Sequence, residues 1–196
     1  MFALSAGMAS ANLLSNPGFE TPSGFGNTVL VGSDLSGNSA AQDWLMWNNT
    51  NAVSSTGLYT PPPGLAGSGT YSILVTTSGD DNGIYQTFLP GNTGPNSAIG
   101  SVWVYVLQGS VGMGTGNGGD TLLDTTTSVH DQWVQLSAPN GVSPANEFIV
   151  YSASAGGATF YVDNADVEAV PEPAAWAGLA LGAVALVRRR AKRSAA

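Results

Sequence analysis

Apolar side chains recur at every second position along much of this chain, and this alternation limits the folds that it can adopt. In the segment 102–107, three valines share one face while Trp103, Tyr105 and Leu107 share the other. A period of two belongs to a β-strand, whereas an α-helix repeats every ~3.6 residues. Before residue 174 no segment has a convincing helical period. The sequence therefore predicts an all-β fold up to that point.

The same alternation predicts seven strands. They are expected at 44–47, 71–76, 84–89, 102–107, 133–137, 148–152 and 159–167. Clusters of Gly, Pro, Asn and Asp separate them, and the Gly-rich stretch 109–120 is predicted to be a long flexible loop or a hairpin tip. Short strands with turn signals between them favour a β-sandwich. We expect residues 12–169 to form it as one domain.

The charge of this segment is one-sided. Residues 12–169 hold 12 of the 13 acidic residues and no Lys or Arg, so their formal charge is −12. A surface of this sign repels phosphates and anionic lipid but can attract cations, so we expect no nucleic-acid partner. The chain contains no cysteine, which excludes disulfides, thiolate metal sites and cysteine catalysis.

The last 27 residues, 170–196, are organised differently. Pro171, Glu172 and Pro173 precede an apolar run at 174–187, which is expected to form a single short C-terminal hydrophobic helix. The five basic residues of the chain follow at Arg188, Arg189, Arg190, Lys192 and Arg193. Such a helix extends about 21 Å, less than the roughly 30 Å of a bilayer core, so it can span only transiently and with local thinning. The arginines are expected to stay cytoplasmic. A disordered or amphipathic tail, or a nucleic-acid patch, is the alternative.

These three parts, in this order at the C-terminus, resemble the PEP-CTERM sorting signal of Gram-negative bacteria. In that family an exosortase, which is a membrane cysteine protease, recognises the Pro-Glu-Pro motif and cleaves near it. The resemblance implies that Pro171, Glu172 and Pro173 are the recognition element and that Arg188, Arg189 and Arg190 are a basic stop. It implies an exported protein that is transiently anchored in the inner membrane and then located at the cell surface or outside the cell.

Export also requires an N-terminal signal. Residues 1–11 end in Ala9-Ser10-Ala11, which fits a small-residue cleavage site, but they lack a basic n-region and a full apolar segment. We interpret them as the remnant of a signal peptide whose basic part lies upstream of Met1. An upstream in-frame start codon would support this hypothesis, and a stop codon directly before Met1 would contradict it.

A second resemblance covers most of residues 12–169. The opening Asn12-Leu13-Leu14-Ser15-Asn16-Pro17-Gly18-Phe19-Glu20, the segments 67–72 and 85–88, and the closing run 160–167 resemble jelly-roll carbohydrate-binding modules of the galactose-binding-like superfamily. The resemblance implies a jelly-roll β-sandwich with a structural Ca²⁺ held by Glu20, Asp163 and backbone carbonyls. Carboxylates suit this hard cation, which takes about six to eight oxygen ligands. The alternative is that Glu20 caps a turn and Asp163 binds a backbone amide.

Aromatic residues are the candidates for sugar binding, because aromatic faces stack on sugar rings while amides and carboxylates bind hydroxyl groups. The candidates are Trp44, Trp47, Tyr85, Trp103 and Tyr105, with Gln86 and Gln108 as polar partners. The alternative, which we favour for any single ring, is that these aromatics fill the interior of the sandwich.

Other polar clusters carry weaker signals. Asp80-Asp81-Asn82-Gly83 is a second cation candidate, but it lacks alternating ligand spacing and is predicted to form a hairpin turn. His130 is the only histidine, beside Asp131 and near Ser128, in what reads as a surface loop. The chain has no Gly-x-Ser-x-Gly elbow, and nothing singles out an acid–base pair of carboxylates. We therefore expect no enzymatic activity.

The sequence thus predicts an exported, non-enzymatic β-sandwich that binds or organises exopolysaccharide in a matrix or biofilm. Its partners would be an exosortase and an extracellular polysaccharide. The main alternative is a structural surface protein without a specific sugar ligand, whose Ser/Thr/Asn-rich exterior could itself be glycosylated. A glycoside hydrolase or lyase is a distant alternative.

Overall fold

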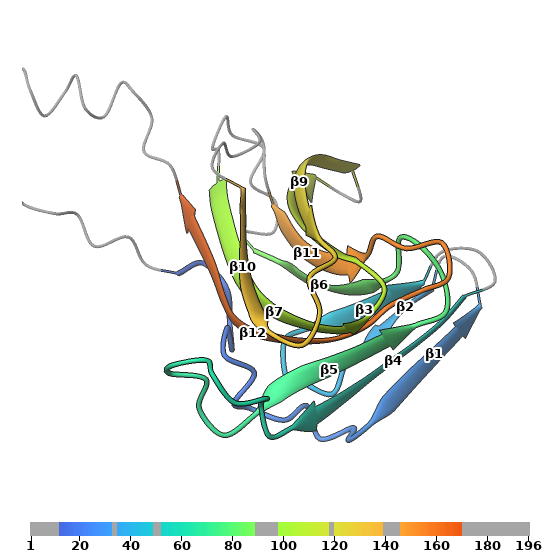
Figure 1. Cartoon of the computed structure of the whole chain (residues 1–196), viewed down its shortest axis with the longest axis horizontal. Helices are drawn as coiled ribbons and strands as arrows, with labels where there is room; N and C mark the ends of the chain where they lie inside the picture. Colours follow the sequence, from blue (N-terminus) through green and yellow to red (C-terminus); the bar gives the residue numbers. More distant parts are fainter. Residues whose placement is uncertain are drawn as a thin grey trace, which may run out of the picture.

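The computed structural model describes residues 12–32, 35–48, 52–88, 98–117, 120–138 and 146–169. These residues form β-strands and no helix, so the predicted all-β fold is confirmed (Figure 1). The strands are β1 (Thr28–Gly32), β2 (Leu35–Asn38), β3 (Leu45–Asn48), β4 (Ala52–Tyr59), β5 (Ser72–Thr77), β6 (Gly83–Thr87), β7 (Ala98–Gln108), β8 (Val111–Asn117), β9 (Asp120–Thr127), β10 (Trp133–Ala138), β11 (Glu147–Ser152) and β12 (Thr159–Ala169).

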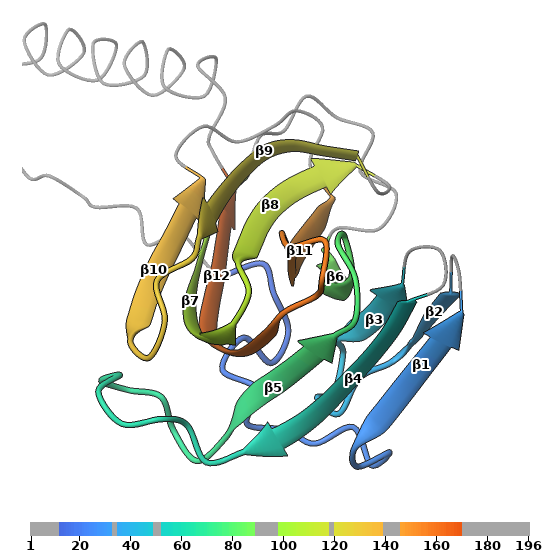
Figure 2. The same cartoon turned by 45° about the vertical axis from the view of Figure 1, so that its right-hand side comes forward.

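The strands pair into two six-stranded antiparallel sheets that pack as a β-sandwich (Figures 1 and 2). Sheet one has the order β1-β4-β5-β12-β7-β10, and sheet two has the order β2-β3-β6-β11-β8-β9. From β5 onward the chain crosses repeatedly between the sheets, which is typical of a jelly roll. The predicted fold class is therefore the observed one.

All seven predicted strands are present, with ends that differ by a few residues. In β7 the alternation has the expected result, because Val102, Val104 and Val106 are fully buried between the sheets. Trp103 and Tyr105 point outward and are half-buried. The largest fully buried side chains of the interior are Trp44, Phe19, Phe148 and Phe160.

The stretch 109–120, predicted to be a long flexible loop or a hairpin tip, contains the whole of strand β8, so the long loop is wrong; at its end Asn117 pairs with Asp120, where the hairpin of β8 and β9 closes. Val111, Met113 and Thr115 are buried and alternate with glycines, so the period of two continues with Gly in the outward positions. A Cβ atom at Gly112 would lie 2.5 Å from the Tyr151 ring. Glycine marks a close approach here, as it often does inside strands.

Strand β4 was not predicted, because polar side chains occupy its inward positions. Ser54 and Thr56 are buried. Thr56 Oγ1 accepts a hydrogen bond from the Ala40 amide (2.9 Å) and forms a second hydrogen bond with Thr28 Oγ1 (2.8 Å). This end of the sandwich therefore has a polar interior, in which Thr56 is hydrogen bonded and Ser54 Oγ has no hydrogen-bond partner.

Two predicted segments lie outside the described residues: the signal-peptide remnant at 1–11 and the sorting signal at 170–196, with its apolar helix at 174–187. Within the part of the chain that the structure describes, no helix has the length and apolar character needed to cross a membrane.

Candidate functional site

A bulge in β12 brings the first and last described segments together. The ladder with β7 shifts register between Asp163 and Asp166. The amide of Ala165 donates to the Pro17 carbonyl (2.9 Å), and the amide of Leu13 donates to the Val167 carbonyl (2.8 Å). The N-terminal segment thus continues sheet one beside the second half of β12.

Glu20 lies at this junction and holds the loop between β4 and β5. Its carboxylate accepts hydrogen bonds from the backbone amides of Thr70 and Tyr71, each at 3.0 Å. A Cβ atom at Gly69 would collide with the same carboxylate, so only glycine lets the loop approach this closely. The capping role that we considered as the alternative for Glu20 is therefore present in the structure.

Asp163 is fully buried at the start of the bulge. Its Oδ1 atom accepts a hydrogen bond from the Asn164 amide (2.7 Å), whereas its Oδ2 atom is buried without a hydrogen-bond partner. Burial raises the pKa of the Asp163 carboxyl from 3.8 to about 7, the Asn164 amide partly offsets this rise, and the charge of Glu20 adds to it. A buried, unsatisfied carboxylate oxygen is costly unless a cation or a proton compensates it.

These residues fit a bound cation. Two carboxylates close enough to interact supply hard oxygen ligands, and one oxygen is unsatisfied. Gly18 lies between them, since a Cβ atom there would be 3.9 Å from Glu20 Cγ and 4.0 Å from Asp163 Oδ1. Among the described residues no three His, Cys, Asp or Glu side chains group together, so backbone or amide oxygens would have to complete the shell.

Trp44, one of the predicted sugar-binding residues, belongs to the interior. It is 1% exposed, and its Nε1 atom donates to the Asn16 carbonyl (3.1 Å). Its ring packs against Phe19 and Phe148, with centroids 4.8 and 6.2 Å away. The alternative of a core aromatic holds at this position, so the assignment of Trp44 to a sugar site is corrected.

Gln86, predicted as a polar partner for sugar, is also turned inward. Its amide nitrogen donates to the carbonyls of Ser15 (2.9 Å) and Asp43 (3.0 Å), and its amide oxygen accepts from the Ser15 amide (2.6 Å). The side chain is 5% exposed. Gln86 therefore fixes two loops and has no polar atom left for a ligand.

Trp47 and Tyr85 lie together on the outer face of sheet two. Their ring centroids are 6.0 Å apart and their planes meet at 77°. The Tyr85 hydroxyl also hydrogen bonds with Ser36 Oγ on β2, so the tyrosine crosses over β3. Both rings are half-buried, which leaves part of each accessible.

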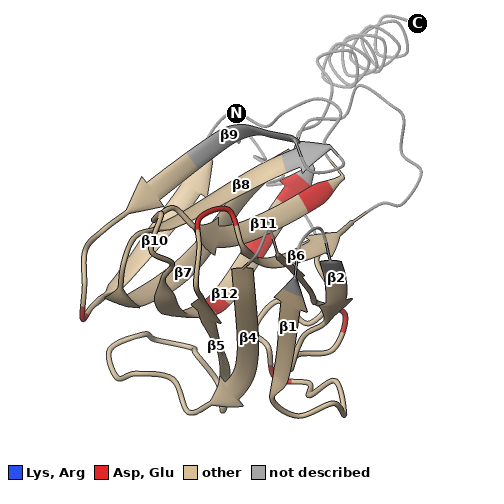
Figure 3. Ribbon diagram, turned by 90° about the vertical axis from the view of Figure 1, so that its right-hand side faces the viewer, with Lys and Arg blue, Asp and Glu red and all other residues tan. Residues whose placement is uncertain are grey.

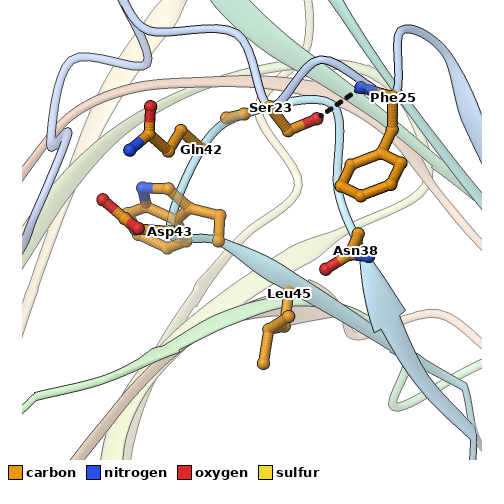
Figure 4. Close-up of a pocket in the computed structure, with 8 residues that line it drawn as sticks. Ser23, Phe25, Asn38, Gln42, Asp43 and Leu45 are labelled. Atoms are coloured by element: carbon orange, nitrogen blue, oxygen red, sulfur yellow. Dashed lines mark hydrogen bonds between the residues drawn. The ribbon is translucent and has the colours of Figure 1, made fainter.

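A depression lies where β2 ends and β3 begins (Figure 4). The strand register places Asn38 opposite Leu45, and Leu45 opposite Tyr85. Asn38 and Leu45 line the depression, which has a volume of about 330 Å³. Its rim is completed by Ser23, Phe25, Ala41, Gln42, Asp43 and Trp44.

Apart from Trp44, which lines the depression although its ring is 1% exposed, the residues of this rim were missed in the sequence. Phe25 is 61% exposed and stands between Gly24 and Gly26, both with a left-handed backbone. The one available signal was an exposed aromatic residue in a glycine-containing loop, because binding residues are often found on loops.

Trp103 and Tyr105 lie on the opposite side of the molecule, on the outer face of sheet one. Tyr105 contacts the rings of Trp133 (5.6 Å) and Tyr161 (6.5 Å). Trp133 Nε1 donates to the Pro62 carbonyl (3.0 Å), so the loop between β4 and β5 packs against this cluster. Gln108 is exposed at the end of β7. The five predicted aromatics therefore occupy three places and not one site.

The remaining candidates have local roles. Residues 80–82 lie in the connection from β5 in sheet one to β6 in sheet two, and Gly83 begins β6, so the predicted hairpin is corrected. The Asn82 side chain donates to the Asp80 carbonyl (2.7 Å), and the Asp81 amide donates to the Ser152 carbonyl (2.9 Å). His130 is exposed, and its Nε2 atom hydrogen bonds with the Gly109 carbonyl at 2.8 Å.

Figure 3 shows the distribution of charge, with acidic residues scattered over both sheets. The described residues contain no Lys or Arg. Neither outer face can therefore form an ion pair with an anionic ligand through a Lys or Arg side chain.

Comparisons with known proteins agree on the fold. A cyclase from Fischerella sp. TAU is 15% identical, with a TM-score of 0.52, covering 83% of this chain and 99% of the cyclase. An arabinose-bound α-L-arabinofuranosidase is 16% identical, with a TM-score of 0.51 over 82% of this chain, which spans only 26% of that enzyme. A xylan-binding domain from Paenibacillus barcinonensis is 17% identical, with a TM-score of 0.48, covering 73% of this chain and 99% of the domain. The cyclase and the arabinofuranosidase, with TM-scores above 0.5, establish the fold alone.

No protein-family profile matches the sequence, and no curated protein matches it significantly.

Proposed function

We propose that this protein binds extracellular polysaccharide through the outer face of sheet two and is not an enzyme. The observation that carries the proposal is the pair of half-exposed rings, Trp47 and Tyr85, which meet at 77° beside an open depression. Sugar rings stack on such aromatic faces, and the side chains of Asn38, Gln42 and Asp43 supply donors and acceptors for hydroxyl groups.

The negative charge of the domain limits the class of polysaccharide that it can bind. The described residues include no Lys or Arg to bind a uronate or sulfate group, and the acidic domain repels such polymers. We therefore expect a neutral polysaccharide, for example a component of the extracellular matrix or of a biofilm.

Truncation of either ring is expected to weaken binding at least tenfold. The Trp47→Ala and Tyr85→Ala proteins each lose one stacking partner, and about 1.4 kcal/mol corresponds to a factor of ten in affinity. The measurement is affinity electrophoresis and calorimetry with soluble xylan, mannan and mixed-linked glucan, and with alginate as the acidic glycan.

The matched control is Trp103→Ala, because Trp103 is a half-buried tryptophan on the opposite sheet. Each variant is first checked for native circular dichroism. Equal loss in all three variants, or alginate as the preferred ligand, would contradict the proposal. Absence of binding to any glycan, including the organism's own exopolysaccharide, would favour the structural surface protein.

We further propose that Glu20 and Asp163 hold a structural Ca²⁺. What supports this is the unsatisfied Oδ2 atom of Asp163 next to a second carboxylate. When bound, the cation would supply positive charge in a domain that contains no Lys or Arg. The part played by the chain is to orient the two carboxylates and to exclude water from Asp163.

The route to the cell surface is proposed from the C-terminal sequence. The Pro-Glu-Pro motif, the apolar run and the arginines support recognition of residues 170–196 by an exosortase, followed by release of the tail. Substituting Glu172 and Pro173 together by alanine is then expected to leave the tail attached and the protein in the inner-membrane fraction.

The measurement is the intact mass of the mature protein after cell fractionation, with Glu168→Ala as the control just upstream of the motif. A wild-type protein that keeps residues 174–196 at the cell surface would contradict sorting by cleavage.

A further inference from the structure

Strand β1 forms one edge of sheet one and exposes an unusual amount of apolar surface. It pairs with β4 on one side, and the described chain places no strand on its other side (Figure 2). Val29 and Val31 are 64% and 63% exposed. Val53, which lies opposite Val31 on β4, is 39% exposed. Together these valines form an apolar strip along the edge.

The backbone N–H and C=O groups of Val29 and Val31 point away from the sheet. The Val53 amide donates to Ser78 Oγ (2.8 Å), and the Val53 carbonyl accepts from the Ser78 amide (2.9 Å). Because Ser78 follows β5, both backbone groups of Val53 point toward β5. Backbone groups alternate sides along an antiparallel strand. The backbone groups of Ser54 therefore point toward β1, where Leu30 is the register partner of Ser54. It follows that Val29 and Val31 direct their N–H and C=O groups outward from the edge.

This edge lacks the usual protection against pairing. Natural edge strands carry charges, prolines or bulges that prevent contact with another sheet. Neither β1 nor β4 contains a charged residue or a proline, and their register is regular. By contrast, the edge strand β9 of sheet two contains Asp120 and Asp124, and it has a register shift against β8.

We propose that β1 pairs antiparallel with β1 of a second copy of this chain, about a two-fold axis at Leu30. In this register Val29 lies opposite Val31 of the second copy, and each such pair exchanges both of its hydrogen bonds. The four valines come together on the outer face, where side chains of opposed residues are neighbours. The two copies thereby share one continuous sheet.

The electrostatics and the size of the contact define the kind of dimer. Each domain is acidic, so the copies repel one another at a distance, but no charge lies on the paired strands. Salt screens that repulsion, so the dimer is favoured by higher ionic strength. Five paired residues bury less than the roughly 1,000 Å² of a stable interface, so the dimer forms only at high local concentration.

Sedimentation velocity of the full-length protein over a hundredfold concentration range, at low and high salt, tests the proposal. The weight-average sedimentation coefficient is expected to rise toward that of a dimer, and to rise more at high salt. Val31→Glu adds repelling charges, and Val31→Pro removes one outward N–H without touching the bonds to β4. Both variants are expected to stay monomeric. Val129→Glu, a valine with 42% exposure elsewhere, is expected to behave as wild type.

Single cysteines test the register, because the natural chain has none. A mixture of the Val29→Cys and Val31→Cys proteins is expected to form a disulfide-linked dimer of the two under mild oxidation, in excess over either protein alone. A wild-type protein that is monomeric throughout the range overturns the proposal. The proposal is also overturned if the Val31→Glu protein still forms the dimer and has the same unfolding temperature as the wild type.

Discussion

Substitution of Asp163 by asparagine is expected to stabilise the calcium-free protein at alkaline pH and to abolish its response to Ca²⁺. The pKa of Asp163 is about 7 in the folded protein and 3.8 as the ordinary value. Between these pH values the unfolded chain releases a proton that the folded protein keeps, so wild-type stability falls as the pH rises from about 4 to 7. Three pKa units correspond to about 4 kcal/mol, which is the upper limit of the gain expected for Asp163→Asn at pH 8.

Calcium is expected to reverse this loss in the wild type. A cation beside Oδ2 favours the ionised carboxyl, so saturation at ~100 times the dissociation constant adds about 2.7 kcal/mol and raises the unfolding temperature by about 5–10 °C. At pH 5 the effect is smaller, because a proton competes with the cation. The measurement is thermal unfolding at pH 5 and pH 8, with Ca²⁺ and with EDTA.

The control for this series is Glu168→Gln, on the same strand and exposed to solvent. It should follow the wild type in all four conditions. Equal unfolding temperatures with Ca²⁺ and EDTA at pH 8 would exclude the cation. A wild-type stability that does not fall between pH 4 and pH 7 in EDTA would show that Asp163 is not held in a desolvated position.

The second large effect is expected from Trp44→Ala, which should lower the free energy of unfolding by about 3–5 kcal/mol. The substitution empties a fully buried volume beside Phe19 and Phe148, and it leaves the Asn16 carbonyl without its Nε1–H donor. Because small domains are stable by only about 5–15 kcal/mol, part of the population should unfold at moderate temperature.

Trp47→Ala is the matched comparison, since Trp47 lies three residues away and is half-buried on the outer face. It should cost clearly less stability while removing a stacking surface. Urea denaturation of both variants gives the two free energies. Similar losses would mean that Trp47 is also a core residue, and the proposed sugar site would lose its main ring.

Whether a strand could be predicted from the sequence depended on which residue types occupied its alternate positions. Strand β7 was found because valines alternate with aromatic residues, whereas β4 and β8 were missed because Ser, Thr and Gly occupy alternate positions. These residue types also mark turns, so the period is visible only when burial is known. In both strands the missing signal has a structural reason, either hydrogen bonding in the interior or a tyrosine ring over the backbone.

The candidate site was harder to predict than the fold. Trp44 and Trp47 look alike in the sequence, yet one is internal and the other half-exposed. Their difference depends on where β3 begins, which single-residue patterns do not fix. Glu20 and Asp163 are far apart in the chain, and only a family resemblance suggested that they meet. The unsatisfied oxygen of Asp163 could be seen only in the folded structure.

The position of β12 has a consequence for how the chain is made. The last strand of the described chain is an inner strand of sheet one, between β5 and β7, and the N-terminal segment also depends on it for hydrogen bonds. Sheet one therefore cannot close while residues 159–169 are still inside the ribosome. The domain can therefore complete its folding only after residues 159–169 have been synthesised. This late closure is compatible with the export that we propose, because a narrow translocation pore passes only unfolded chains.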